Sequence, residues 1–64
     1  MHGRILRIHD RGFGFLRDVE TGQEYFFHMS GCRTPFDALT IDQTVTFEVE
    51  PSDRGPRACR VRAV

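Results

Sequence analysis

Two short segments of the chain concentrate aromatic side chains close to an arginine. Residues 11–16 read RGFGFL, and residues 25–30 read YFFHMS. Aromatic rings present flat faces on which nucleic-acid bases stack, and a guanidinium group suits bidentate contacts with phosphate. If part of this cluster is exposed on one surface, the sequence favours binding of single-stranded nucleic acid. If all of the rings are buried, they are only the core of a small protein.

Other reactive side chains do not form a convincing site. His28 and Cys32 have a spacing that could bind zinc, with His9 and Cys59 as further ligands, but paired ligands such as Cys-x2-Cys are absent. Cys32 could act as a nucleophile beside His28, yet so small a protein offers little pocket around it. The chain has neither a Gly-x-Ser-x-Gly motif nor a P-loop. We therefore predict no enzyme, catalytic residue, metal, cofactor or small-molecule substrate.

Length and charge narrow the class of protein. A chain of 64 residues supports one core, so we expect a single domain over residues 1–64 and a monomer. No apolar segment is long enough to span a membrane, and residues 1–10 lack the apolar run of a signal peptide, which favours the cytoplasm. Two cysteines are too few for a disulfide-built domain, so both are expected to be free thiols. The formal net charge is zero, so contacts with a polyanion depend on where the nine arginines lie.

The elements that position these residues are predicted to be strands. Thr44–Glu50 alternates apolar and polar residues with the period of two of a half-buried strand. Residues 58–64 repeat the pattern, which puts Cys59, Val61 and Ala63 on the core side, and residues 51–56 (PSDRGP) form a turn between the two strands.

The N-terminal half predicts three more strands. Phe13–Val19 and Glu24–Met29 form a hairpin whose connection contains Gly22, and Arg4–His9 is a first strand whose uneven apolar pattern indicates a bulge. Asp37–Leu39 is expected to form at most one short helical turn. Five short strands with glycine and proline connections predict an all-β fold, a small closed barrel.

Alternation along the hairpin decides which rings are exposed. If Leu16, Tyr25 and Phe27 are buried, the outer face carries Phe13, Phe15, Phe26 and His28. The reverse arrangement buries His28, which then needs partners for both ring nitrogens. Gly12 and Gly14 also favour the first arrangement, because glycine in a strand is best explained by a bend or by close approach of a ligand. An exposed apolar face would also suit a protein partner.

The two aromatic segments resemble the motifs of the bacterial cold-shock domain family. RGFGFL is similar to that family's first RNP motif, and YFFHMS is similar to the second. Residues 44–64 resemble its closing segment, so the resemblance covers essentially the whole chain. It implies a five-stranded antiparallel OB-type barrel that binds single-stranded RNA or DNA, and an ATP-independent RNA chaperone.

The resemblance also implies which residues contact nucleic acid. Stacking residues would be Phe13, Phe15, Phe26 and His28, and Phe36 matches an aromatic of the long loop that often stacks a further base. Arg11 stands at the lysine of the first motif, and together with Arg7 and Arg54 it is best placed for phosphate.

Two departures from the family pattern affect the expected surface. Arg7 stands where the family has a principal stacking tryptophan, and Met29 stands where a third aromatic is common. The end of the surface near Arg7 is therefore expected either to bind more weakly or to stack a base on the guanidinium plane. The alternative function is a protein-interaction module on a degenerate cold-shock barrel.

Overall fold

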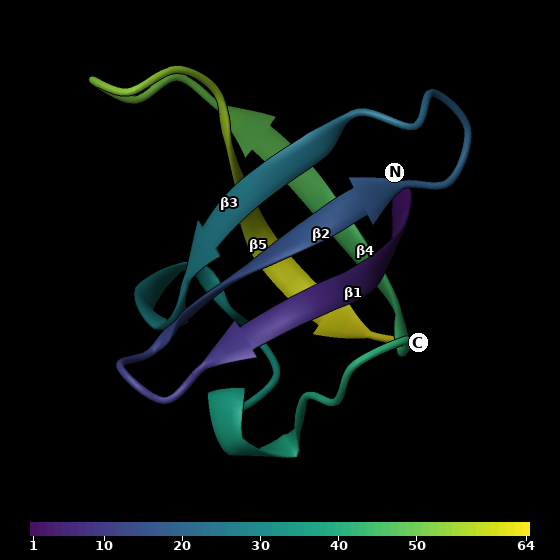
Figure 1. The fold of residues 1–64 in the computed structure, drawn as a ribbon, viewed down its shortest axis with the longest axis vertical. Helices are drawn as coiled ribbons and strands as arrows, with labels where there is room; N and C mark the ends of the chain where they lie inside the picture. The colour runs from purple at the N-terminus through teal and green to yellow at the C-terminus, as the bar shows by residue number, and fades with distance from the viewer.

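The computed structural model describes residues 1–64 as five strands and two single-turn 3-10 helices. In chain order these are β1 (His2–His9), β2 (Phe13–Asp18), β3 (Glu24–His28), η1 (Met29–Gly31), η2 (Phe36–Ala38), β4 (Thr44–Glu50) and β5 (Arg57–Ala63). The strands form a closed barrel in the order β1-β2-β3-β5-β4 (Figure 1). The predicted all-β, five-stranded barrel is thus confirmed. No helix has the length and apolar character needed to cross a membrane.

One strand pair corrects the expected purely antiparallel barrel. β3 and β5 run parallel, with Phe26 opposite Arg57 and Phe27 opposite Ala58, whereas the other four pairs are antiparallel. A parallel pair needs a long connection. The chain makes this connection by leaving β3 through η1 and η2, forming β4, and returning as β5 between β3 and β4.

The predicted bulge in β1 is present and lies at Leu6. Ile5 pairs with Leu16 and Arg7 with Phe15, so Leu6 is the extra residue. The bulge restarts the alternation, because Ile5 is buried and Ile8 packs against the core while Arg7 is exposed. The bulge therefore places Arg7 and the end of β1 on the outer face.

The predicted alternation of β5 is confirmed from Arg60 to Ala63 and is wrong at Cys59. Val61 is buried, Ala63 packs against the core and both arginines are exposed, but Ala58 is buried in place of the half-buried Cys59. Between Thr46 and Glu48 the pairing of β4 shifts from Arg62 to Cys59, which leaves one extra residue on β5. Arg60 lies at this bulge with φ of 51°, in the left-handed region.

Other limits of the elements differ by one or two residues. β1 begins at His2 because residues 2–4 pair with β4. β2 ends at Asp18 rather than Val19, since the Asp18 carboxylate accepts hydrogen bonds from the backbone N–H groups of Glu20 and Thr21 and starts the turn, in which Gly22 has φ of 77°. Met29 begins η1 instead of ending β3, and the predicted turn near residues 37–39 is η2.

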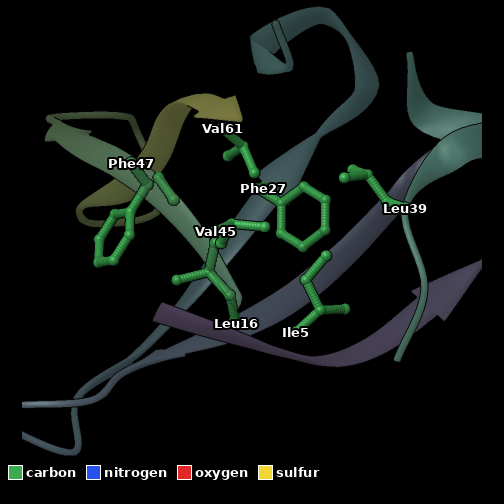
Figure 2. Close-up of a cluster of buried hydrophobic side chains, with 8 residues drawn as sticks. Ile5, Leu16, Phe27, Leu39, Val45, Phe47 and Val61 are labelled. Carbon is green, nitrogen blue, oxygen red and sulfur yellow. The ribbon is translucent and has the colours of Figure 1, made fainter. Parts of the chain in front are cut away.

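The core fills the barrel with side chains from β1, β2, β3, β4, β5 and the segment after η2. Figure 2 shows the Phe27 ring among the aliphatic side chains that surround it. The buried hydrophobic residues are Ile5, Leu16, Phe27, Leu39, Val45, Phe47, Ala58 and Val61. Leu39 lets the connection between β3 and β4 contribute to this core, which ties it to the barrel.

Candidate nucleic-acid interface

The outer face of β1, β2 and β3 carries the exposed rings, and we call it the aromatic surface. Leu16 and Phe27 have no exposed area, while the side chains that alternate with them on β2 and β3 reach the solvent. Tyr25 is half-buried and its ring packs 5.7 Å from that of Phe47. The predicted choice of face is therefore confirmed. Its members on β2 and β3 are Phe13, Phe15, Phe26 and His28.

The register of the sheet arranges this surface in two rows across the strands. One row runs from Arg7 through Phe15 and Phe26 to Arg57, and the other runs from His9 through Phe13 to His28. Directly opposed residues in adjacent strands have Cβ atoms about 4.5–5.5 Å apart, so each row is a set of cross-strand neighbours. A row of three or four flat groups is the form of surface on which successive bases can stack.

The rings also contact one another. The Phe15 and Phe26 centroids lie 5.9 Å apart with an interplanar angle of 72°, and those of Phe13 and Phe26 lie 5.7 Å apart with an angle of 32°. His9 stacks on Phe13 at 4.6 Å with an angle of 11°. Edge-to-face and offset pairs stabilise each other, which restricts each ring. The surface is thus ordered before any ligand arrives.

His28 is held by the residue that follows β3. Its Nδ1 accepts a hydrogen bond from the backbone N–H of Ser30 at 3.1 Å and lies 2.9 Å from the Ser30 hydroxyl. Because Nδ1 is the acceptor, the neutral imidazole carries its proton on Nε2. The ring orientation is fixed, and Nε2–H is left as a donor for a base edge or a phosphate.

Gly14 is explained by packing, not by a ligand lying against the strand. It is buried, and a Cβ atom there would meet the carbonyl oxygen of Arg7 and lie 2.8 Å from the Phe27 ring. Glycine therefore lets β1 and the Phe27 ring approach β2 closely. At the preceding turn Gly12 has φ of 92°, which suits glycine.

A hollow of about 400 Å³ lies at the β1 end of the aromatic surface. Arg7 forms one of its walls and has no ion pair with a carboxylate. Ile41, from the segment before β4, is 59% exposed and forms another. The remaining lining residues are Ile8, His9, Phe13, Gly14 and Phe15. The guanidinium therefore stands beside apolar and aromatic groups, where a flat base would contact both.

A second hollow, of about 430 Å³, lies at the opposite end beside Phe26. The turn between β4 and β5 forms its walls, including Arg54 and Pro56. Arg57 also lines it, and its guanidinium contacts Glu50 at 3.0 Å. A hydrogen bond from Cys59 and a second from Arg57 hold the pKa of the Glu50 carboxyl below its usual value. Arg54 has no such partner and remains free for a phosphate.

The structure places Arg11 and Met29 together at the corner next to Phe13. Arg11 is exposed in the turn between β1 and β2, and its backbone N–H donates to His9 Nδ1 at 3.2 Å. The Met29 side chain lies against Gly12 and is 52% exposed, while its backbone N–H donates to the Gly12 carbonyl at 2.7 Å. Both predicted residues thus border the aromatic surface.

Phe36 is separated from the other predicted rings. It is half-buried in η2 and packs against Phe27, with ring centroids 6.2 Å apart. It forms no ring contact with the aromatic surface. Any role in binding would depend on its exposed part, which lies on η2 and outside the aromatic surface.

The structure adds three residues that the sequence reasoning did not assign to the surface: His9, Ile41 and Arg57. His9 could have been found, because it lies two residues after Arg7 and shares its face. Ile41 lies in an irregular segment, and Arg57 enters the row through the parallel pairing of β3 and β5. Neither relation produces a periodic signal in the sequence.

The whole chain, residues 1–64, matches a family described as "'Cold-shock' DNA-binding domain". The chain therefore belongs to the cold-shock domain family, whose members are non-enzymatic domains that bind nucleic acid. Similar relatives include Cold shock protein 1 of Lactiplantibacillus plantarum, which is 45% identical over 53 residues, or 81% of this chain and 79% of the relative. The Major cold shock protein of Streptococcus pyogenes serotype M6 is 42% identical over 81% of this chain and 78% of its own length. Cold shock-like protein CspE of Bacillus anthracis is 43% identical over 81% of this chain and 78% of its own length.

Proposed function

We propose that the aromatic surface binds single-stranded RNA or DNA by stacking unpaired bases, and that the protein acts as an ATP-independent RNA chaperone. The observation that carries this proposal is the pair of rows, in which rings from adjacent strands lie side by side, with the unpaired Arg7 and Arg54 in the hollows at the two ends. Phe13, Phe15, Phe26 and His28 are assigned the stacking role. We further propose that the protein works as a monomeric single domain in the cytoplasm.

The arginines are assigned to the ends of the bound strand. Arg11 and Arg54 contact phosphates, because both are exposed next to the rings and free of carboxylate partners. Arg7 offers its guanidinium plane to one more base over the hollow that it shares with Ile41. Met29 flanks the path of the strand beside Phe13, and the exposed part of Phe36 contacts a base only where the strand continues past the aromatic surface to η2.

Stacking energies explain how such a protein could open RNA structure without ATP. Each stacked base contributes about 1–3 kcal/mol, so three or four stacks hold an unpaired segment firmly. A protein that binds only the open form shifts the opening equilibrium by mass action, by about 2.7 kcal/mol when its concentration is 100 times Kd. That is enough to melt marginal hairpins and too little to melt long duplexes.

The test combines binding with hairpin opening. A pyrimidine-rich and a mixed single strand, each fluorescently labelled, are titrated with the protein, and a hairpin RNA with a fluorophore and a quencher is followed without ATP. We expect binding of both strands and opening that rises with protein concentration. The double variant Phe15→Ala/Phe26→Ala should lose both. Undiminished binding and opening in this folded variant would refute the proposal and point to a protein partner for the surface.

A further inference from the structure

A second group of arginines surrounds a hollow of about 320 Å³ on the β4 and β5 side of the barrel. Arg33, Arg60 and Arg62 form its basic walls. Arg60 lies 3.7 Å from Glu48, whereas Arg33 and Arg62 form no ion pair. Met1, Thr46, Phe47 and Glu48 complete the lining. Three guanidinium groups thus share one hollow with a single carboxylate, in a chain whose overall charge is balanced.

The local backbone explains why the three arginines come together. After the bulge, strand alternation buries Val61 and exposes Arg60 and Arg62 on either side of it. Arg33 is brought beside them because its backbone N–H donates to the Val61 carbonyl at 2.7 Å. Arg60 adopts φ of 51°, a conformation that is unfavourable for a long side chain. Bulges that re-aim a side chain and backbone strain of this kind are common at functional sites.

This arginine hollow is distinct from the aromatic surface. The rings lie on the outer face of β1 to β3, whereas Arg60 and Arg62 lie on the outer face of β5. In Figure 1, β2 passes in front of β4 and β5, so outward side chains of these strands leave the barrel on opposite sides. The hollow also lacks an exposed ring, because Phe47 is only 2% exposed.

We propose that the arginine hollow is a second nucleic-acid site that binds the phosphates of a separate segment without contacting its bases. Guanidinium groups bind phosphate oxygens through paired N–H donors, and the missing rings exclude stacking. Such a site needs no unpaired bases, so it favours a duplex, which presents two phosphates for every one that a single strand presents over the same length. If the aromatic surface holds unpaired bases, as proposed above, one molecule can then join a single-stranded segment to a neighbouring helix.

The experiment uses a labelled blunt DNA duplex, whose bases are exposed for stacking only at its two ends, with a short unlabelled single strand in excess to occupy the aromatic surface. Three phosphate contacts on a duplex predict a slope of log affinity against log salt of about −2.7. The wild type should then lose about 40-fold in duplex affinity between 50 and 200 mM salt. The variant Arg33→Gln/Arg62→Gln, with one arginine left, should bind the duplex more weakly and lose only about 3–4-fold over the same range.

A charge-matched variant and the single strand supply the controls. Arg4→Gln/Arg17→Gln removes the same charge from positions outside the hollow and should keep the wild-type salt dependence. The Arg33→Gln/Arg62→Gln variant should bind the short single strand as the wild type does. Equal loss in both double variants would reduce the effect to net charge, and displacement of the duplex by the single strand would mean one shared site. Either result overturns the proposal. If instead the wild type binds the duplex but fails to bind the single strand, the proposed function is refuted and the duplex site stands.

Arg60→Gly separates binding from folding. Glycine accepts positive φ, so this variant should unfold at the same or a higher temperature than the wild type. Its duplex affinity should nevertheless fall, with a salt slope reduced by about 0.9. An unchanged affinity and slope would show that Arg60 serves only the bulge and would contradict the three-arginine site.

Discussion

The two antiparallel pairs β2–β3 and β4–β5 build different outer surfaces over the same core. In β2–β3 the register is unbroken from Phe13 to Arg17, and the outward positions carry rings at regular cross-strand spacing. In β4–β5 a bulge at Arg60 interrupts the ladder, and the outward positions carry guanidinium groups. A regular ladder suits flat stacking partners, which need even spacing. In the irregular ladder Arg60 and Arg62 lie on either side of the buried Val61, and Arg33 joins them through its hydrogen bond to the Val61 carbonyl.

The largest expected effect separates the two faces of β3 through adjacent phenylalanines. Phe27 has no exposed area, so Phe27→Ala should destabilise the protein by about 3–5 kcal/mol, from lost burial and the cavity left behind. Phe26 is 36% exposed, so Phe26→Ala should cost much less stability. Urea unfolding followed by circular dichroism measures both. Similar losses in the two variants would mean that the outer face contributes to the core.

These strand pairs also show what the sequence could predict. The phase of β2 and β3 followed from alternation, because an unbroken ladder keeps the period of two that the sequence displays. The prediction for β5 was wrong at Cys59, because an extra residue at Arg60 shifts the alternation midway along the strand. Arginine in a sequence does not indicate positive φ. The parallel pairing of β3 with β5 depends on the path of a long connection, so Arg57 could not be assigned to the aromatic surface.

A binding measurement with single variants sharpens the role of the regular ladder. Phe15→Ala and Phe26→Ala should each weaken binding of a short single-stranded oligonucleotide by about 1–3 kcal/mol, since each removes one stacking face. Fluorescence polarisation gives the dissociation constants. Val19→Ala is the matched control, because Val19 is exposed but lies beyond the end of β2. A loss for Val19→Ala as large as for the rings would argue against stacking.

The salt dependence of single-strand binding distinguishes the aromatic surface from the arginine hollow. Phosphate contacts from Arg11 and Arg54, with a third if Arg7 binds a phosphate instead of a base, predict a slope of roughly −1.5 to −2, because each contact on a single strand contributes about −0.7. Titrations of a short oligonucleotide at several salt concentrations give this slope. A value steeper than about −4 would require more contacts than these arginines provide and would indicate general polyanion binding.

Arg7 tests the weaker end of the aromatic surface. If its guanidinium stacks a base, Arg7→Ala should lower single-strand affinity, by less than a phenylalanine variant does, and Arg7→Trp should preserve or raise it. The chain has no tryptophan, so the fluorescence of Arg7→Trp reports binding directly. An unchanged affinity of Arg7→Ala, with an unquenched indole in Arg7→Trp, would show that the hollow beside Ile41 is unused.

The smallest effect concerns the irregular pair and tests on which side of β5 Cys59 lies. The thiol is half-exposed, so in Cys32→Ser it should react with iodoacetamide from the native state, which a core position such as that of Val61 would prevent.

Partial burial, followed by the hydrogen bond with Glu50, raises the pKa of the Cys59 thiol. The native reaction should therefore be slow at neutral pH and accelerate at a higher pH than in the denatured chain. Because folding raises this pKa, the thiol contributes stability that is complete below the unfolded-state pKa and is lost as the pH rises through the native one. Burial of the thiol is unchanged in Glu50→Gln, but the variant removes the Glu50 charge that adds to the rise of the thiol pKa, so it should speed the native reaction. Labelling that occurs only on unfolding would place Cys59 in the core and contradict the bulge at Arg60.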